Sequence, residues 1–144
     1  MKAWRVQELG EPKQALRLEE VDEPTPGRGE VVVEMEAASL NFFDARLCRG
    51  EYQEKPELPF TPGAEVSGTV SQTGEGVDLR EGSRVLATPP LPNGGFAERV
   101  AVPAESVFAI PDDMPFDAAA AMHIVYQTAY FALHRRANLR EGET

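Results

Sequence analysis

"EVVVEMEAASLNFFDARLCRG", residues 30–50, places a valine-rich run directly before a run that resembles a short helix. The valine content of residues 30–40 predicts a long β-strand, and Asn41 to Arg49 is predicted to form a helix. Asn41 stands at the junction. Asparagine is a preferred helix N-cap, and Asp44 follows three residues on, as in a capping box with Asp in place of Glu. A cap can also serve in an active site, so both interpretations of Asn41 stay open.

Most of the remaining chain is also predicted to form short strands. Apolar and polar residues alternate over residues 2–9 and 16–21, which is the period of a half-buried strand. The Pro- and Gly-rich stretch Pro24–Glu30 predicts a turn. Further strands are expected over residues 65–74, 82–90, 95–103 and 106–111. Many short strands at such spacing predict a mainly β protein, either a barrel or a sandwich.

The second helical region is expected near the end of the chain, at residues 115–136. Pro115 and Asp117 suit a helix start, and the basic run His134–Arg136 suits the negative end of the helix dipole. Part of the centre is β-branched, so either one helix or two consecutive helices fit the pattern. Apolar residues recur near helical spacing at Ala119, Met122, Tyr126, Ala129, Tyr130 and Leu133.

Size and composition restrict the classes of function. The 144 residues suffice for one domain with its own core, and the formal net charge of −10 argues against nucleic-acid partners. No apolar run approaches the ~20 residues of a membrane helix, so no membrane partner is expected. The N-terminus lacks a signal-peptide pattern and Cys48 is the only cysteine, so a reducing cytoplasmic location is predicted.

Several common chemistries find no support in the sequence. One cysteine and two histidines, His123 and His134, make a weak metal-ligand set. Gly74 and Gly76 begin a dinucleotide fingerprint, but Leu79 stands where the third glycine is required, so a hairpin turn is the better interpretation. No G-x-S-x-G hydrolase motif is present.

Five stretches, read together and in order, resemble the medium-chain dehydrogenase/reductase superfamily, and within it the zinc-free NADPH:quinone oxidoreductases of the ζ-crystallin-like branch. The likeness spans Met1 to Thr144 and matches the N-terminal GroES-like catalytic domain. The stretches are SLNFFDARLCRGEY (39–52), LPFTPGAEVSGTVSQTGEGV (58–77), EGSRVLA (81–87), GGFAERVAVP (94–103) and AAAAMHIVYQTAYFAL (118–133).

The resemblance implies a GroES-like, partly open β-barrel. Residues 1–114 would form the catalytic, substrate-binding domain. Residues 115–144 would form a helical connection toward a Rossmann cofactor domain that this chain does not contain.

The resemblance also bears on zinc. Zinc-dependent relatives carry Gly-His-Glu where this chain has Gly63-Ala64-Glu65, and a cysteine ligand where it has Asn41. Alanine has no lone pair for a metal, and a neutral amide is a poor zinc ligand. Relatives with a structural zinc have a four-cysteine lobe where residues 86–95 form a short loop without cysteine. No metal is therefore expected.

What the resemblance implies about activity is hydride transfer from NADPH to a quinone or another α,β-unsaturated carbonyl. The partners would be these small molecules, and the full-length protein is expected to be a homo-oligomer. The isolated 144 residues are expected to be inactive, because the phosphate and adenine sites lie in the Rossmann domain. The alternative is a non-catalytic binding or structural relative built on the same barrel.

The resemblance assigns roles to seven side chains, each with an alternative structural role. Asn41 and Tyr52 would be catalytic and would contact the cofactor, together with Met122, Val125 and Thr128, while Phe43 and Arg46 would line the substrate. In structural terms, Tyr52 is a surface aromatic, Thr128 a helical threonine bonded to its own backbone, and Met122 and Val125 plain core. Arg46 departs from the aromatic of some relatives, and its alternative is a solvent-facing side chain. Glu65, the acid beside the lost histidine, is interpreted as a buried structural residue.

Overall fold

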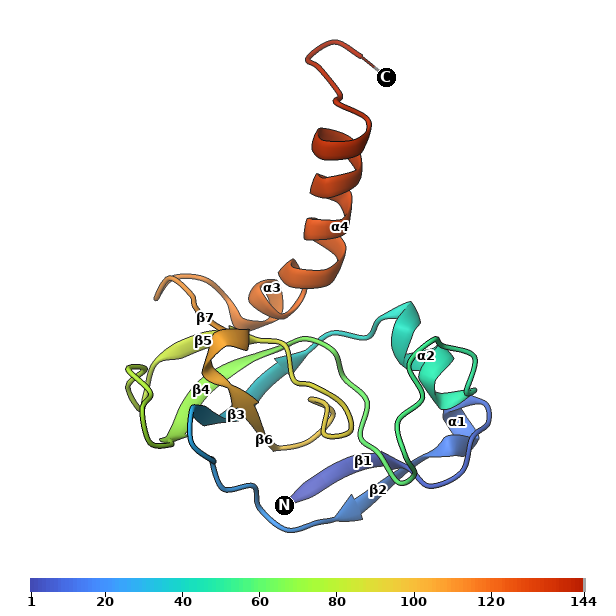
Figure 1. Ribbon diagram of the computed structural model, residues 1–144, viewed down its shortest axis with the longest axis vertical. Helices are drawn as coiled ribbons and strands as arrows, with labels where there is room; N and C mark the ends of the chain where they lie inside the picture. The colour runs from blue at the N-terminus through green and yellow to red at the C-terminus, as the bar shows by residue number, and fades with distance from the viewer. Residues whose placement is uncertain (144) are drawn as a thin grey trace.

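The computed structural model describes residues 1–143 and consists of a β-domain from which a helical segment projects (Figure 1). Two strands form a small antiparallel sheet: β1 (Lys2–Val6) and β2 (Leu16–Glu20). Five form an antiparallel sheet in the order β6-β3-β4-β5-β7. Their bounds are β3 Glu30–Ala38, β4 Val66–Thr73, β5 Arg84–Ala87, β6 Arg99–Pro103 and β7 Val107–Ala109.

Short helices connect and cover the sheets. They are α1 Pro12–Ala15, α2 Phe42–Cys48, a 3₁₀ turn Ala104–Ser106, α3 Phe116–Ala120, a π-helical segment Met122–Tyr126, α4 Gln127–Tyr130 and a second π-helical segment Phe131–Arg136. The two sheets do not close into one barrel, and β1 meets the larger assembly through isolated bridges at Ala3–Ala97 and Val6–Phe60. The predicted mainly β, GroES-like architecture with a partly open barrel is confirmed. None of the described helices has the length and apolarity to cross a bilayer.

Two apolar clusters hold the domain together. The first lies within the five-stranded sheet and consists mainly of buried valines. The second lies beneath α1 and α2 and contains Val6, Ala15, Leu47, Cys48 and Phe60. The second cluster fixes α2 against β1 and so positions the junction that holds Asn41.

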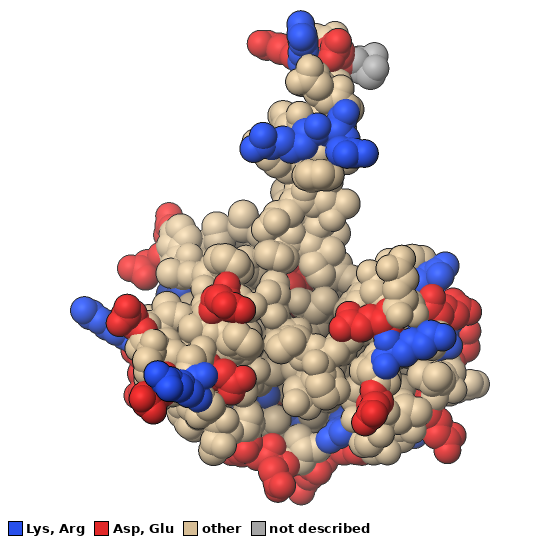
Figure 2. Space-filling view, in the orientation of Figure 1, with Lys and Arg blue, Asp and Glu red and all other residues tan. Residues whose placement is uncertain are grey.

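The helical region near 115–136 is present but interrupted. In α3, Ala119 and Ala120 are buried against the sheet, since α3 contacts β3, β4 and β5. The helix breaks at Ala121 (φ −94°, ψ 0°), and the chain then projects from the domain as a helical arm, residues 122–136 (Figure 1). Basic side chains gather near its far end, whereas acidic ones surround the base of the domain (Figure 2). The prediction of two consecutive helices describes this break better than one helix.

Several strands are shorter than the sequence pattern predicts. Residues 82–90 yield only β5, because Pro89 and Pro90 cannot extend the backbone ladder. Residues 95–98 lie outside β6, where the Gly94–Gly95 pair makes a tight approach to Pro62 and Val66. The alternation of apolar and polar residues therefore predicted where these strands lie, and the proline and glycine residues of the turns determined where they end.

Candidate functional site

The junction between β3 and α2 carries the first group of candidate side chains. Asn41 is the N-cap of α2 and forms a capping box with Asp44. The Asn41 backbone N–H donates to Asp44 Oδ2 at 2.8 Å. The Asn41 side-chain amide turns toward the start of β4, and its Nδ2 donates to Ser39 Oγ at 2.9 Å and to Glu65 Oε1 at 3.2 Å. The N-cap predicted for Asn41 is therefore present. The cap does not use the side-chain amide nitrogen of Asn41, so this nitrogen can also bind another group.

Asp44 fixes the other side of this junction. It is buried, and its Oδ1 accepts the Gly63 backbone N–H at 2.9 Å. Burial raises the pKa of Asp44 above its ordinary value, and the nearby Glu65 charge adds to the increase. Hydrogen bonds from the backbone N–H groups of Asn41, Gly63 and Asp44 itself partly oppose it. Asp44 thus joins α2 to the Gly63–Glu65 turn.

Glu65 is the centre of the site. Its side chain is fully buried, and Oε1 accepts Ser39 Oγ at 2.6 Å in addition to the Asn41 amide. The other oxygen, Oε2, accepts the Ile124 backbone N–H at 2.8 Å. One carboxylate therefore contacts the end of β3, the N-cap of α2 and the first turn of the helical arm.

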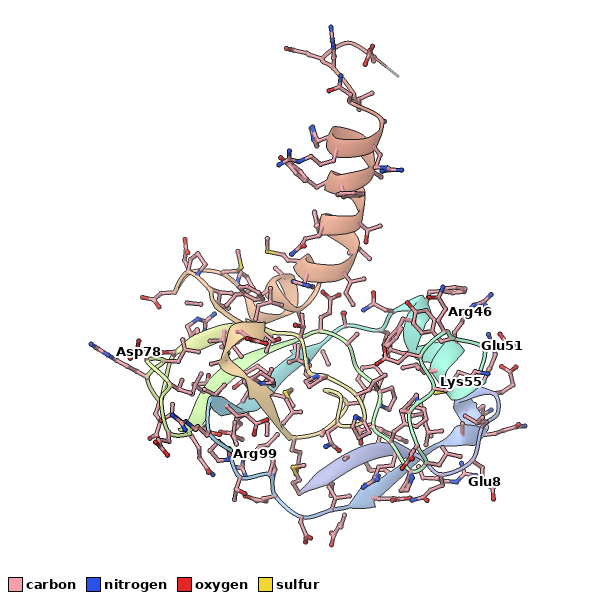
Figure 3. The ribbon with its side chains drawn as sticks, viewed as in Figure 1. Glu8, Arg46, Glu51, Lys55, Asp78 and Arg99 are labelled. Carbon is pink, nitrogen blue, oxygen red and sulfur yellow. The ribbon has the colours of Figure 1, made fainter. Side chains whose placement is uncertain are left out.

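Tyr52 and Phe43 form an aromatic pair beside α2. Their rings meet edge to face with centroids 4.7 Å apart, and both pack on the second apolar cluster. Arg46 lies on the outer side of α2 (Figure 3), half-buried, with its guanidinium 4.9 Å from the Phe42 ring centroid. Tyr52 is thus a partly buried aromatic whose hydroxyl forms no hydrogen bond among residues 1–143.

The helical arm carries the remaining candidates. Met122 and Val125 are 41% and 51% exposed, so they are not core residues within residues 1–143. Thr128 Oγ1 donates to the Ile124 carbonyl at 2.6 Å, which is the bond to its own backbone expected from the structural alternative. A shallow groove of about 460 Å³ runs along this arm between Leu86, Met122 and Tyr126. The structure thus brings Asn41 to the base of the arm and leaves Tyr52, Phe43 and Arg46 around α2.

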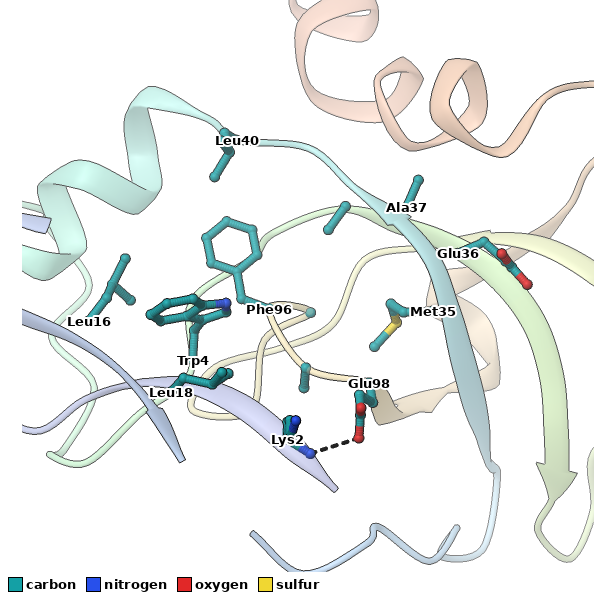
Figure 4. Close-up of a pocket in the computed structure, with 13 residues that line it drawn as sticks. Lys2, Trp4, Leu16, Leu18, Met35, Glu36, Ala37, Leu40, Phe96 and Glu98 are labelled. Carbon is teal, nitrogen blue, oxygen red and sulfur yellow. Dashed lines mark hydrogen bonds between the residues drawn. The ribbon is translucent and has the colours of Figure 1, made fainter. Parts of the chain in front are cut away.

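A separate, mainly apolar hollow lies between β1, β2 and β3. It has a volume of about 680 Å³ and is walled by Trp4, Leu18, Met35, Leu40 and Phe96, with the Lys2 backbone N–H bonded to Glu98 at one end (Figure 4). None of the seven predicted site residues lines it. We place the candidate site at the Glu65 network, because that is where buried polar groups from separate elements converge.

Two participants were not among the predicted site residues. Ser39 was not considered, although it stands two residues before Asn41 on an extended chain, a spacing that places both side chains on one side. Glu65 was interpreted as structural only. Within residues 1–143 no three His, Cys, Asp or Glu side chains come close enough to hold a metal ion.

The raised pKa of Asp44 predicts a pH effect on stability. The folded state binds the Asp44 proton more tightly than the unfolded state. The free energy of unfolding therefore falls as pH rises from the ordinary pKa of 3.8 through the raised pKa of the folded state. Above the raised pKa, Asp44 causes no further change in the free energy of unfolding. Urea denaturation of the wild type and Asp44→Asn, from about pH 4 to pH 7, should show the wild type losing stability relative to the variant as pH rises.

Asp78→Asn, in an exposed loop, is the matched control for loss of one negative charge. If the difference between wild type and Asp44→Asn were the same at every pH, the burial of the Asp44 charge would have no energetic consequence.

Comparison with known proteins agrees with this fold. The family model described as the alcohol dehydrogenase GroES-like domain matches residues 27–112. A quinone oxidoreductase-like protein 2 homolog of Nematostella vectensis is 44% identical over 82% of this chain and 32% of its own length. The human synaptic vesicle membrane protein VAT-1 homolog-like protein superposes with a TM-score of 0.91 at 38% identity, over 99% of this chain and 45% of that one.

A quinone oxidoreductase of Thermus thermophilus, solved alone and in complex with NADPH, superposes with a TM-score of 0.82 at 40% identity, over 99% of this chain and 43% of that one. The chain spans less than half the length of each of these relatives. The fold and the matched residues define the class, a GroES-like domain of the alcohol dehydrogenase type. The chain belongs to this family, within the medium-chain dehydrogenase/reductases, and several of the longer proteins that it matches are named quinone oxidoreductase or quinone oxidoreductase-like protein.

Proposed function

We propose that this chain is the catalytic domain of an NADPH-dependent oxidoreductase that transfers hydride to a quinone or another α,β-unsaturated carbonyl without zinc. The observation that carries the proposal is the Asn41 amide, held by Glu65 at the base of the helical arm. In this proposal the catalytic domain ends near residue 114, and residues 115–144 lead to a cofactor domain. The protein works as a cytoplasmic homo-oligomer.

The donor set at the site fits the nicotinamide end of the cofactor. It offers the Asn41 amide, the Tyr52 hydroxyl and an exposed apolar face at Met122 and Val125, which suit a flat, uncharged ring with a carboxamide. When bound, NADPH supplies the hydride. The phosphate groups of the cofactor would bind outside these residues.

The same side chains do not fit zinc. The Asn41 Nδ2 donates toward Glu65, so the group directed at the acid carries protons and no free lone pair. The neighbouring Ala64 has only a methyl group. The proposed reaction therefore has no step that uses a metal.

In the proposed reaction the protein orients the acceptor and the cofactor, and it polarises the carbonyl group of the acceptor. Asn41 donates an N–H to the carbonyl oxygen of the acceptor or to the cofactor carboxamide, and this stabilises negative charge that grows on oxygen during transfer. In this proposal the Tyr52 hydroxyl hydrogen-bonds the same ligand, and the Phe43 ring packs edge to face against the Tyr52 ring. Conjugation in the acceptor spreads the charge, so a few well-placed donors suffice.

Turnover by the full-length protein that contains this chain tests the proposal. NADPH oxidation with a panel of benzoquinones and enones should be measurable, should survive a strong chelator, and should be absent from the isolated residues 1–144. Asn41→Ser keeps an N-cap and removes the amide, and should lower kcat/KM by about 10- to 100-fold with little change in thermal stability.

Two outcomes would count against the proposal. Loss of turnover on chelation would overturn its zinc-free part. A full-length protein that binds but never oxidises NADPH would favour the alternative, a non-catalytic binding or structural protein built on the same domain.

A further inference from the structure

Glu65 is buried without a cation beside it. Its side chain is inaccessible to solvent, and the ion pairs found within residues 1–143 all lie at Arg49 and Arg99. A buried carboxylate needs compensating hydrogen bonds, and here neutral donors supply them: Ser39 Oγ, the Asn41 amide and the Ile124 backbone N–H. Such an arrangement fixes the direction of every partner, because a carboxylate can only accept.

The direction of the Asn41 amide follows from this. Its Nδ2 must face Glu65 Oε1, since the amide oxygen would be repelled there. The three distances that join Asn41 Nδ2, Ser39 Oγ and Glu65 Oε1 are 2.6, 2.9 and 3.2 Å, so the two acceptors subtend an angle of only about 50° at the nitrogen.

The two protons of an amide nitrogen lie about 120° apart, so both acceptors share one proton and the second points elsewhere. No other acceptor for Asn41 Nδ2 occurs in the described part of the chain. The second proton is therefore free for a ligand.

The other oxygen of Glu65 holds the helical arm. The helix breaks at Ala121, and the first N–H groups of a helical segment generally have no partner within it. Glu65 Oε2 accepts one of them, that of Ile124, and its negative charge lies at the positive end of the segment. The Glu65 side chain thus connects Asn41 to the helical arm that carries Met122 and Val125.

We propose that Glu65 is the positioning residue of this site: its carboxylate anchors one N–H of Asn41, directs the second N–H to the ligand, and holds the helical arm in register with it. This inference rests on the proposed oxidoreductase function for its kinetic consequences. Its structural part, the coupling of Asn41 to the arm, stands apart from that function.

Glu65→Gln in the full-length protein tests both parts. The glutamine amide presents protons of its own, so Asn41 is free to rotate. We expect kcat to fall roughly tenfold or more, with a smaller change in the KM for NADPH. In the Asn41→Ser background the same change should lower kcat by a clearly smaller factor than in the wild type, because the amide that Glu65 orients is already gone and only the anchoring of the arm is left to lose. Equal losses in both backgrounds would mean that Glu65 acts only as a structural residue, and would overturn the proposal.

Hydrogen exchange gives a readout that needs no activity. The Ile124 amide should exchange roughly tenfold faster in Glu65→Gln than in the wild type, while amides of β4 stay protected. Unchanged exchange at Ile124 would overturn the coupling even in an inactive protein. If the wild type does not oxidise NADPH, the proposed function fails while this measurement still decides the anchoring.

Two further variants serve as the control for Glu65→Gln and as its substitute if it does not fold. Glu54→Gln changes an exposed glutamate and should match the wild type in kcat and in exchange. Should Glu65→Gln fail to fold, Ser39→Ala removes one of the three donors and leaves the acid in place. It should lower kcat by about two- to fivefold through a less fixed Asn41, and a kcat equal to that of the wild type would overturn the proposal.

Discussion

Gly68→Ala is expected to lower the free energy of unfolding by about 3 kcal/mol or more, which is a large part of the stability of a typical domain. Gly68 lies in β4 opposite Met35, beside an irregularity in the β3–β4 register. A Cβ at this position would lie 1.9 Å from the Glu34 carbonyl oxygen and 2.9 Å from its carbon. Backbone atoms cannot rotate out of the way, so β3 and β4 must separate locally.

The consequence reaches the candidate site. Ser39 follows β3 and Glu65 precedes β4, so a shift between these strands pulls on both sides of the Glu65 network. Urea or thermal denaturation followed by circular dichroism measures the loss. Gly10→Ala is the control, because no heavy atom lies within 4 Å of the added Cβ, and it should change stability by less than about 0.5 kcal/mol. Equal midpoints for the two variants would show that the close β3–β4 contact is not required.

Phe60→Ala is the second large effect and should cost about 3–5 kcal/mol. Phe60 is 1% exposed and sits in the second apolar cluster with Val6, Leu47 and Cys48. Its backbone is bonded to Val6 in both directions, at 2.8 and 3.3 Å, so the main chain cannot collapse readily into the cavity. Loss of the ring removes support from beneath α2.

Phe42→Ala is the matched control, since the Phe42 side chain is 73% exposed and the Arg46 guanidinium lies over the face of its ring. It should cost less than about 1 kcal/mol. Chemical denaturation measures both losses: if the dependence of the free energy of unfolding on denaturant concentration is the same for Phe60→Ala and Phe42→Ala, their midpoints report the difference in stability. If Phe60→Ala were as mild as Phe42→Ala, the cluster beneath α2 would contribute little to the fold.

The candidate site could be predicted only in part from the sequence. Asn41, at a strand-to-helix junction with Asp44 three residues on, carries a local signal that the structure reproduces as a capping box. Thr128 forms the bond that its structural alternative predicts, since its hydroxyl donates to the Ile124 carbonyl one turn earlier. Its role toward a cofactor stays a proposal, as do those of Tyr52, Met122 and Val125.

The sequence by itself determined the architecture of this domain, because alternation, valine runs and Gly/Pro punctuation act over a few residues and fix where strands, turns and helices form. The family resemblance further implies that Asn41 and Ala64 stand where zinc-dependent relatives carry metal ligands, and the zinc-free reaction stays a proposal. Only the tertiary structure decided that Glu65 joins Asn41 to Ile124, across 24 and 59 residues of sequence. Such contacts depend on how β3, β4 and the helical arm pack in space, and no local pattern in the chain encodes them.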